Sequence, residues 1–214
     1  MSSASLNTLT SAGEIQQRLD RRIENLLGSL PDIERLSKAE RRGIIARYSS
    51  VLEGNFIYWM TGAYLSVKSP QAQAIIIENL TEEVRDCHPG MLRRFAFAAG
   101  AVPTDADAAT VYQDLMNVRM FVGRLEAPPL LTMMAFFEGF IQRFMAYLED
   151  LSRRQGSTER EYTVVHGTCD IVHTQELHRA LEMEREMANG AGKHMDLFEG
   201  VGHLDALLRK VVTG

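Results

Sequence analysis

The apolar residues of this chain recur at intervals of three and four along nearly its whole length, and this spacing constrains the fold more than any other feature. Such a spacing places apolar side chains on one face of an α-helix. No alternating apolar and polar pattern longer than four residues, as a half-buried strand would show, interrupts it. We therefore predict an all-α protein, a bundle of about seven helices.

Capping residues, prolines and glycines divide this pattern into separate helical segments. Ser37 and Glu40 have the spacing of a capping box, so a long helix is expected to begin there. Pro70 occupies a first-turn position, and the His-Pro-Gly sequence at 88–90 is expected to break or kink the chain. The predicted helices cover residues 12–28, 38–67, 70–87, 106–122, 129–154, 158–188 and 193–212, with a short helix that ends at residue 97.

Length and composition limit the class of protein. The chain has 214 residues, of which 45% are apolar and 24% charged, so residues 12–214 are expected to form a single helical domain with its own core. Residues 1–11 are rich in serine and threonine and are expected to be disordered. The formal charge of −5 disfavours general binding to nucleic acids or to anionic membranes.

Neither a membrane span nor a secretion signal is expected from the sequence. No apolar run approaches the roughly 18 residues of a spanning helix, and the first residues lack a basic start followed by an apolar stretch. Cys87 and Cys169 indicate neither a disulfide framework nor a Cys-x-x-Cys metal motif. A cytoplasmic protein is therefore the expectation.

The most informative motif is the triplet His166, Asp170 and His173. At about 100° per residue, their side chains fall within an arc of roughly 60° on one helix face. Imidazole and carboxylate ligands together suit iron or manganese, and imidazole also suits zinc. The alternative interpretation is a solvated polar face without a metal.

Isolated acids in apolar helical stretches form a second pattern. Glu53, Glu78 and Glu138 each have mainly apolar neighbours, and a buried carboxylate is costly unless it is paired or bound to a metal. In helical bundles, carboxylates and histidines from facing helices build two-metal sites. Each acid alone has the alternative of a surface position or a salt bridge, and His88 alone suits a helix C-terminus through the helix dipole.

Taken in order, these residues resemble one known family. The sequence Glu53, Glu78, His88, Glu138 and His166-x3-Asp170-x2-His173 is similar to the ligand order of the haem-oxygenase-like di-iron oxidases and oxygenases. The resemblance spans residues 53–173, and the His-x3-Asp-x2-His motif is its most specific part. It implies a seven-helix haem-oxygenase-like fold in which all seven of these residues are metal ligands.

The assignment of one acid stays open among three neighbours. Glu78, Glu82 and Glu83 all precede His88, and the distance from acid to histidine varies in the family. Glu78 is favoured because its immediate sequence is apolar. Glu82 and Glu83 would then lie behind the ligands or face solvent.

The resemblance also implies a chemistry. Members of this family bind two iron ions, use O₂ as co-substrate, and need an external electron donor to return the iron from Fe³⁺ to Fe²⁺. They modify small amino-acid-derived or carboxylic-acid metabolites by N-oxygenation, oxidative C–C cleavage or nitrile formation, typically in biosynthesis. The expected partners are thus a small-molecule substrate and an electron donor, and a homodimer is possible.

Residues one helical turn from the predicted ligands are expected to line the substrate pocket, with ordinary core packing as the alternative. They are Phe56, Met60, Met134, Ile141 and Gln142. Candidate cations for a substrate carboxylate are Arg85, Arg94, Arg119 and Arg124, each of which also suits the surface. Cys169 is expected to be a buried structural thiol rather than a nucleophile.

Three other functions compete with this interpretation. A cofactor-free enzyme of the same fold is one, although the cysteine and acid pattern of the hydrolase type has no match here. A helical adaptor with a coincidental histidine cluster is the second. A ferritin-like di-iron bundle is the third, but it requires two Glu-x-x-His pairs that the core acids do not provide.

Overall fold

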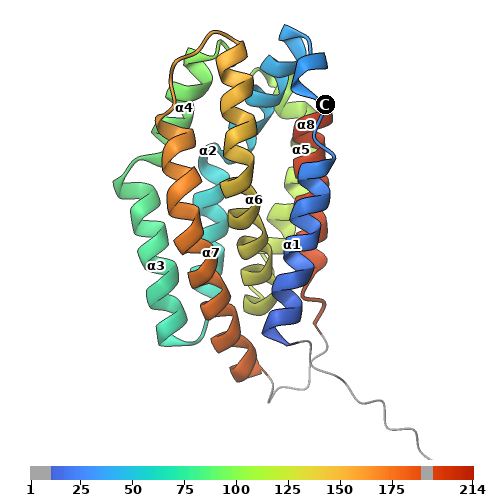
Figure 1. The fold of residues 1–214 in the computed structure, drawn as a ribbon. Helices are drawn as coiled ribbons and strands as arrows, with labels where there is room; N and C mark the ends of the chain where they lie inside the picture. Colours follow the sequence, from blue (N-terminus) through green and yellow to red (C-terminus); the bar gives the residue numbers. More distant parts are fainter. Residues whose placement is uncertain (1–10, 189–194) are drawn as a thin grey trace, which may run out of the picture.

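The computed structural model describes residues 11–188 and 195–214, which form eight α-helices and one short 3₁₀ turn, without a strand. The all-α prediction is confirmed, and the helix count exceeds the expected seven by one (Figure 1). The helices are α1 Ala12–Gly28, α2 Lys38–Ser66, α3 Pro70–Arg85, α4 His88–Ala98, α5 Asp105–Val122, α6 Ala127–Arg154, α7 Glu161–Ala188 and α8 Glu199–Thr213.

Most helix boundaries follow the predicted capping residues. Ser37 and Glu40 form the expected capping box at the start of α2. Ser11 caps α1 in the same way, so the prediction of disorder is wrong for Ser11. Residues 1–10, the rest of that predicted segment, lie outside the described residues. The last helix begins at Glu199, later than predicted, and residues 193 and 194 of the predicted helix lie outside the described residues.

The break between α3 and α4 lies before His88, earlier than the predicted break at residues 88–90. Helix α3 ends at Arg85, and Cys87 adopts a left-handed backbone conformation with φ 57°. Helix α4 then begins at His88 itself, with Pro89 in its first turn, where proline is tolerated. The predicted break therefore lies before His88, and His88 belongs to the rigid start of α4.

Helix α6 is the centre of the bundle (Figure 1). It makes its most extensive contacts with α7 and also packs on α1, α2 and α8. All residues from Ala127 to Ile141 are buried, so the first half of α6 is surrounded by protein on every side. A polar side chain in this segment must therefore find its partners inside the protein.

Helix α2 is kinked beside the centre of the bundle. Glu53 has a non-helical ψ of 83° and Gly54 a φ of +102°, a conformation that residues with a Cβ rarely adopt. The kink lies between Leu52 and Phe56, two side chains that reach the interior of the bundle. Within the described residues, no helix has the length and apolar character needed to cross a membrane.

Candidate metal centre

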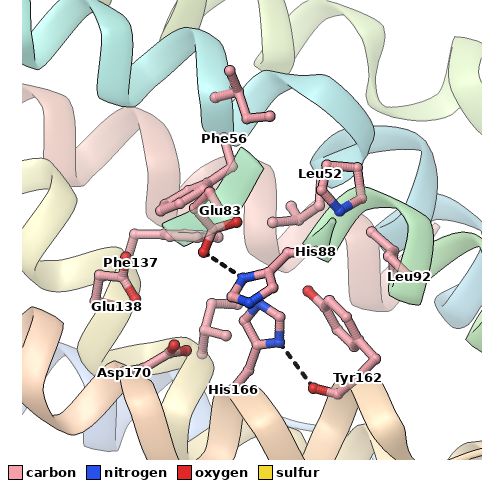
Figure 2. A pocket seen from close by; sticks show the side chains of 13 residues that line it. Leu52, Phe56, Glu83, His88, Leu92, Phe137, Glu138, Tyr162, His166 and Asp170 are labelled. Carbon is pink, nitrogen blue, oxygen red and sulfur yellow. Dashed lines mark hydrogen bonds and ion pairs between the residues drawn. The ribbon is translucent and has the colours of Figure 1, made fainter. Parts of the chain in front are cut away.

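A cluster of buried acids and histidines lies where α3, α4 and α7 meet. Glu83, at the end of α3, His88, at the start of α4, and His166, on α7, each place one ligand atom within 4.8 Å of the others. All three side chains are buried. The left-handed turn at Cys87 brings His88 back onto α3, so that its Nδ1 donates to Glu83 Oε1 at 2.7 Å (Figure 2).

A second group lies one turn further along α7. Cys169, Asp170 and His173 also place ligand atoms within 4.8 Å of one another. Asp170 and His173 are buried, together with His166, which excludes the alternative of a solvated polar face for this triplet. The Nε2 of His173 donates to Glu82 Oε2 at 3.0 Å, and the Cys169 thiol donates to Asp170 Oδ1 at 3.1 Å.

Each of the three histidines is oriented by an oxygen and keeps one ring nitrogen free for a metal. His166 donates from Nδ1 to the carbonyl oxygen of Tyr162 at 2.9 Å, which leaves Nε2 available. Because carboxylate oxygens only accept, the bonds to Glu83 and Glu82 likewise leave Nε2 of His88 and Nδ1 of His173. Such outer hydrogen bonds are typical of metal-binding histidines.

The pKa values of His166 and His88 shift in opposite directions because the surroundings of the two side chains differ. Burial lowers the pKa of His166 to about 4, so its imidazole is neutral at neutral pH, the form that binds metals. Burial also acts to lower the pKa of His88, but the hydrogen bond and the charge of Glu83 outweigh it and raise the pKa. The carboxylate charge that favours a proton on His88 would equally favour a cation bound at its Nε2.

Glu138 and Asp170 have buried carboxylate oxygens without a partner among the described residues. Glu138 lies on α6, its side chain is 3% exposed in total, and its Oε1 has no hydrogen-bond partner, like Oδ2 of Asp170. Burial raises the pKa of Glu138, and the negative charges of Asp170 and Glu83 raise it further. Three buried carboxylates, of which only Glu83 has a basic partner, require protons or a cation to neutralise them.

These acids and histidines surround one small pocket. Figure 2 shows the carboxylates of Glu138 and Asp170 on one side of it and the rings of His88 and His166 on the other. The enclosed space is about 30 Å³, which suits metal ions or water rather than an organic molecule. None of its lining residues is an arginine or lysine. The buried nitrogen and oxygen donors, and the unpaired carboxylate oxygens, therefore fit a metal ion.

The rest of the pocket wall is apolar and agrees in part with the predicted substrate pocket. Phe56 and Ile141 line it, and their role in binding a substrate stays a prediction. Met60 and Met134 are instead packed in the core, so the core alternative holds for them, and Gln142 is half-buried outside the lining. Sequence reasoning did not single out the other wall residues, Leu52, Ile57, Pro89, Leu92, Phe137 and Tyr162.

Three predicted ligands lie outside both groups of ligand atoms: Glu138, which lines the same pocket, and Glu53 and Glu78, which do not. Glu53 is exposed at the kink of α2 and forms an ion pair with Arg93 at 3.2 Å. Glu78 is exposed on α3, in a shallow groove that also contains Glu82 and His173. In this conformation Glu83 lies beside His88, where the sequence predicts Glu78, and the roles of Glu53 and Glu78 as ligands stay predictions.

The spacing of apolar residues along α3 points to Glu83 as a buried acid, although the prediction favoured Glu78 for its apolar neighbours. The buried residues of α3 are Ala72, Ile76, Asn79 and Glu83, at intervals of four, three and four, which is the spacing of one helix face. Glu83 continues that face, whereas Glu78 does not. The apolar neighbours of Glu78 were misleading because Ile77 is itself largely exposed.

The candidate arginines all lie at the surface, as the alternative interpretation held. Arg85 pairs with Asp86, Arg94 with Glu161 and Arg124 with Glu199, and Arg119 packs on the ring of Tyr58. None of them lines the metal pocket. Cys169 is half-buried, and burial raises the pKa of its thiol, which agrees with a structural thiol.

Comparison with known proteins identifies the family. A family model of haem-oxygenase-like proteins, described as iron-containing redox enzymes, matches residues 46–200. Because this match covers more than half of the chain, the chain belongs to this family, and the resemblance inferred from the ligand order is confirmed. The comparison with curated proteins found no significant match. The protein is therefore an iron-containing redox enzyme with a helical haem-oxygenase-like fold.

Proposed function

We propose that this protein is a non-haem di-iron enzyme that uses O₂ to oxidise a small amino-acid-derived or carboxylic-acid metabolite. The observation that carries the proposal is the pair of adjacent ligand groups, joined along one face of α7. Among the described residues, one buried carboxylate oxygen of Asp170 and one of Glu138 have no hydrogen-bond partner. Two cations would satisfy these oxygens where a single cation leaves one group unused.

The donors and the pocket size favour iron ions over haem. Histidine nitrogens and carboxylate oxygens bind iron directly, whereas haem needs a cavity that takes a whole porphyrin. The enclosed space here is about 30 Å³. In the proposed arrangement, Glu83, His88 and His166 would hold one iron and Asp170 and His173 the other, and the carboxylate of Glu138 would be available to either. Glu53 and Glu78 would join only if their side chains turn inward.

Bound ferrous iron supplies the electrons that O₂ chemistry requires. The chain itself fixes the ligands and excludes water. The carbonyl of Tyr162 holds the ring of His166, and Glu82 holds His173. The apolar wall that includes Leu52, Phe56 and Phe137 keeps bulk water away from the ligand atoms. An external donor must return the iron to the ferrous state after each cycle.

The properties of Cys169 weigh against a cofactor-free hydrolase of the same fold. Such an enzyme depends on a reactive thiolate. Burial and the neighbouring Asp170 instead raise the pKa of the Cys169 thiol. The thiol also donates a hydrogen bond to the Asp170 carboxylate. The ligand groups thus support the metal enzyme better than the thiol enzyme.

Iron binding by matched variants tests the proposal. The chain is loaded with Fe²⁺ under anaerobic conditions, freed of excess iron and assayed for iron per chain. Wild type is expected to hold two iron ions and His173→Ala about one, because the variant keeps only one complete group. Glu186→Gln, on the exposed face of the same helix, is the control and should match wild type. Equal iron in wild type and a folded His173→Ala would refute the second site.

A further inference from the structure

A second cavity lies on the outer side of α2 and α4, and we call it the arginine cleft. Its volume is about 430 Å³, within the usual range for small-molecule sites and far above the 30 Å³ of the metal pocket. Its lining comprises Ser49, Glu53, Arg93, Arg94, Ala96, Phe97, Val102 and Pro103. The cleft has room for an organic molecule, which the metal pocket in this conformation lacks.

The cleft and the metal pocket share the same two helices. On α2, Leu52 faces the metal pocket and Ser49 the cleft. On α4, Leu92 faces the metal pocket and Arg93 the cleft. The outer rim is held in place, because Arg42 donates to the carbonyl oxygen of Val102 at 2.7 Å. The cleft is therefore built from rigid elements of the bundle.

Ser49 gives the cleft an unsatisfied polar group. Its side chain is fully buried, and its Oγ has no hydrogen-bond partner in the part of the chain that the structure describes. A helical hydroxyl can bond to the carbonyl four residues earlier, as Thr61 on the same helix does with Ile57 at 2.7 Å. Ser49 does not, and a buried hydroxyl without a partner is unfavourable. A ligand in the cleft would supply the missing partner.

The cleft also combines positive charge with an exposed apolar wall. Arg93 pairs with Glu53 and Arg94 with Glu161, but each guanidinium carries five N–H donors and retains some of them. The lining holds two arginines and one glutamate, and Glu161 outside the lining pairs with Arg94, so each arginine has one carboxylate partner. Phe97 is 76% exposed although it is aromatic, and Val102 is also exposed. This combination matches a molecule with one negative charge and a flat apolar body.

We propose that the arginine cleft binds a small organic monocarboxylate. Its carboxylate contacts Arg93 and Arg94, its apolar body packs on Phe97 and Val102, and a polar group reaches Ser49. A carboxylate is favoured over a phosphate because Glu53 and Glu161 already offset the charge of the two arginines, so a second negative charge on the ligand would stay unbalanced. This site goes beyond the proposed function and does not depend on iron, so metal-free protein serves to test it.

Ligand binding to the metal-free chain tests the site. The probes are benzoate, phenylacetate, indole-3-acetate and hexanoate, with phenylacetamide, acetate and inorganic phosphate as comparisons. Titration calorimetry measures the affinity, and magnetisation transfer between the probe and Phe97 in NMR locates it. At least one apolar carboxylate is expected to saturate and to bind at least about tenfold more tightly than the neutral amide, acetate or phosphate.

Variants decide whether the binding occurs in the cleft. Arg94→Gln, Phe97→Ser and Ser49→Ala are each expected to weaken the best probe at least about tenfold. Arg35→Gln, a similarly charged but distant exposed position, should leave binding unchanged. No saturating carboxylate, equal affinity for amide and acid, a preference for phosphate, or binding that survives all three folded variants would each overturn the proposal. These results bear on the cleft alone, because no iron is present.

Discussion

The replacement Glu138→Gln should stabilise the metal-free protein. The side chain is 3% exposed, its Oε1 has no partner, and Asp170 and Glu83 add negative charge nearby. Glutamine keeps the shape and removes the charge. Replacing an uncompensated buried charge by a neutral residue of similar volume stabilises a protein by about 1–3 kcal/mol. For a chain of this length, that corresponds to a rise in Tm of about 2–12 °C.

The difference should depend on pH in a defined direction. The pKa of Glu138 is raised in the folded protein above its ordinary value of 4.5. The folded state therefore holds a proton that the unfolded state has already lost, so the stability of metal-free wild type decreases as pH rises above about 4.5 toward the folded pKa. The variant lacks this group, so its advantage should be small at pH 5 and largest at pH 8.

Iron should reverse the order of stability. Fe²⁺ binds the folded state only and raises its Tm, and wild type should gain more than Glu138→Gln because the variant lacks one ligand. Thermal unfolding of both proteins at pH 5 and pH 8, with and without anaerobic Fe²⁺, measures the effect of the substitution, of pH and of iron on Tm. Glu186→Gln is the control. A metal-free variant that is less stable than wild type at pH 8, or an equal gain from iron in both, would refute the reasoning.

Three further substitutions test the account of the fold. Tyr48→Phe removes a buried 2.8 Å hydrogen bond to a second tyrosine and should cost about 1–2 kcal/mol in urea unfolding; an unchanged midpoint would contradict this. Gly54→Ala should cost about 1–2 kcal/mol because φ is +102° at the kink, whereas Gly28→Ala, where neither φ nor space opposes a Cβ, should not destabilise. Asp107→Ala breaks a capping box and the ion pair with Arg42, and should lower the free energy of unfolding by about 2 kcal/mol at pH 7 and by less at pH 2–3; a loss independent of pH would argue against the ion pair.

The helices were predictable because their signals are local. The capping box at Ser37 and the proline at 70 begin helices where the sequence predicts. The start of α4 was missed because the left-handed residue there is Cys87, which carries none of the usual preference for that conformation. The kink at Gly54 was missed for a related reason, since an isolated glycine in a helical pattern is usually tolerated.

The candidate site was predictable where its residues lie on one helix. His166, Asp170 and His173 share a buried face of α7 because their spacing dictates it. Glu138 followed from its wholly apolar neighbourhood. The choice among the acids of α3 depends on which face of that helix packs into the bundle, and the spacing of Ala72, Ile76 and Asn79 indicates Glu83 rather than Glu78. Glu83 lies on the buried face of α3 and contacts His88, whereas Glu78 lies on the exposed face.

The number and the oxidation of bound iron ions test the central claim most directly. The chain is loaded anaerobically with ⁵⁷Fe²⁺ and examined by Mössbauer spectroscopy before and after exposure to O₂. The account predicts two ferrous ions per chain in two different environments, both of which lose their ferrous signal in O₂. One iron per chain, no iron, or ferrous iron that is indifferent to O₂ would contradict it.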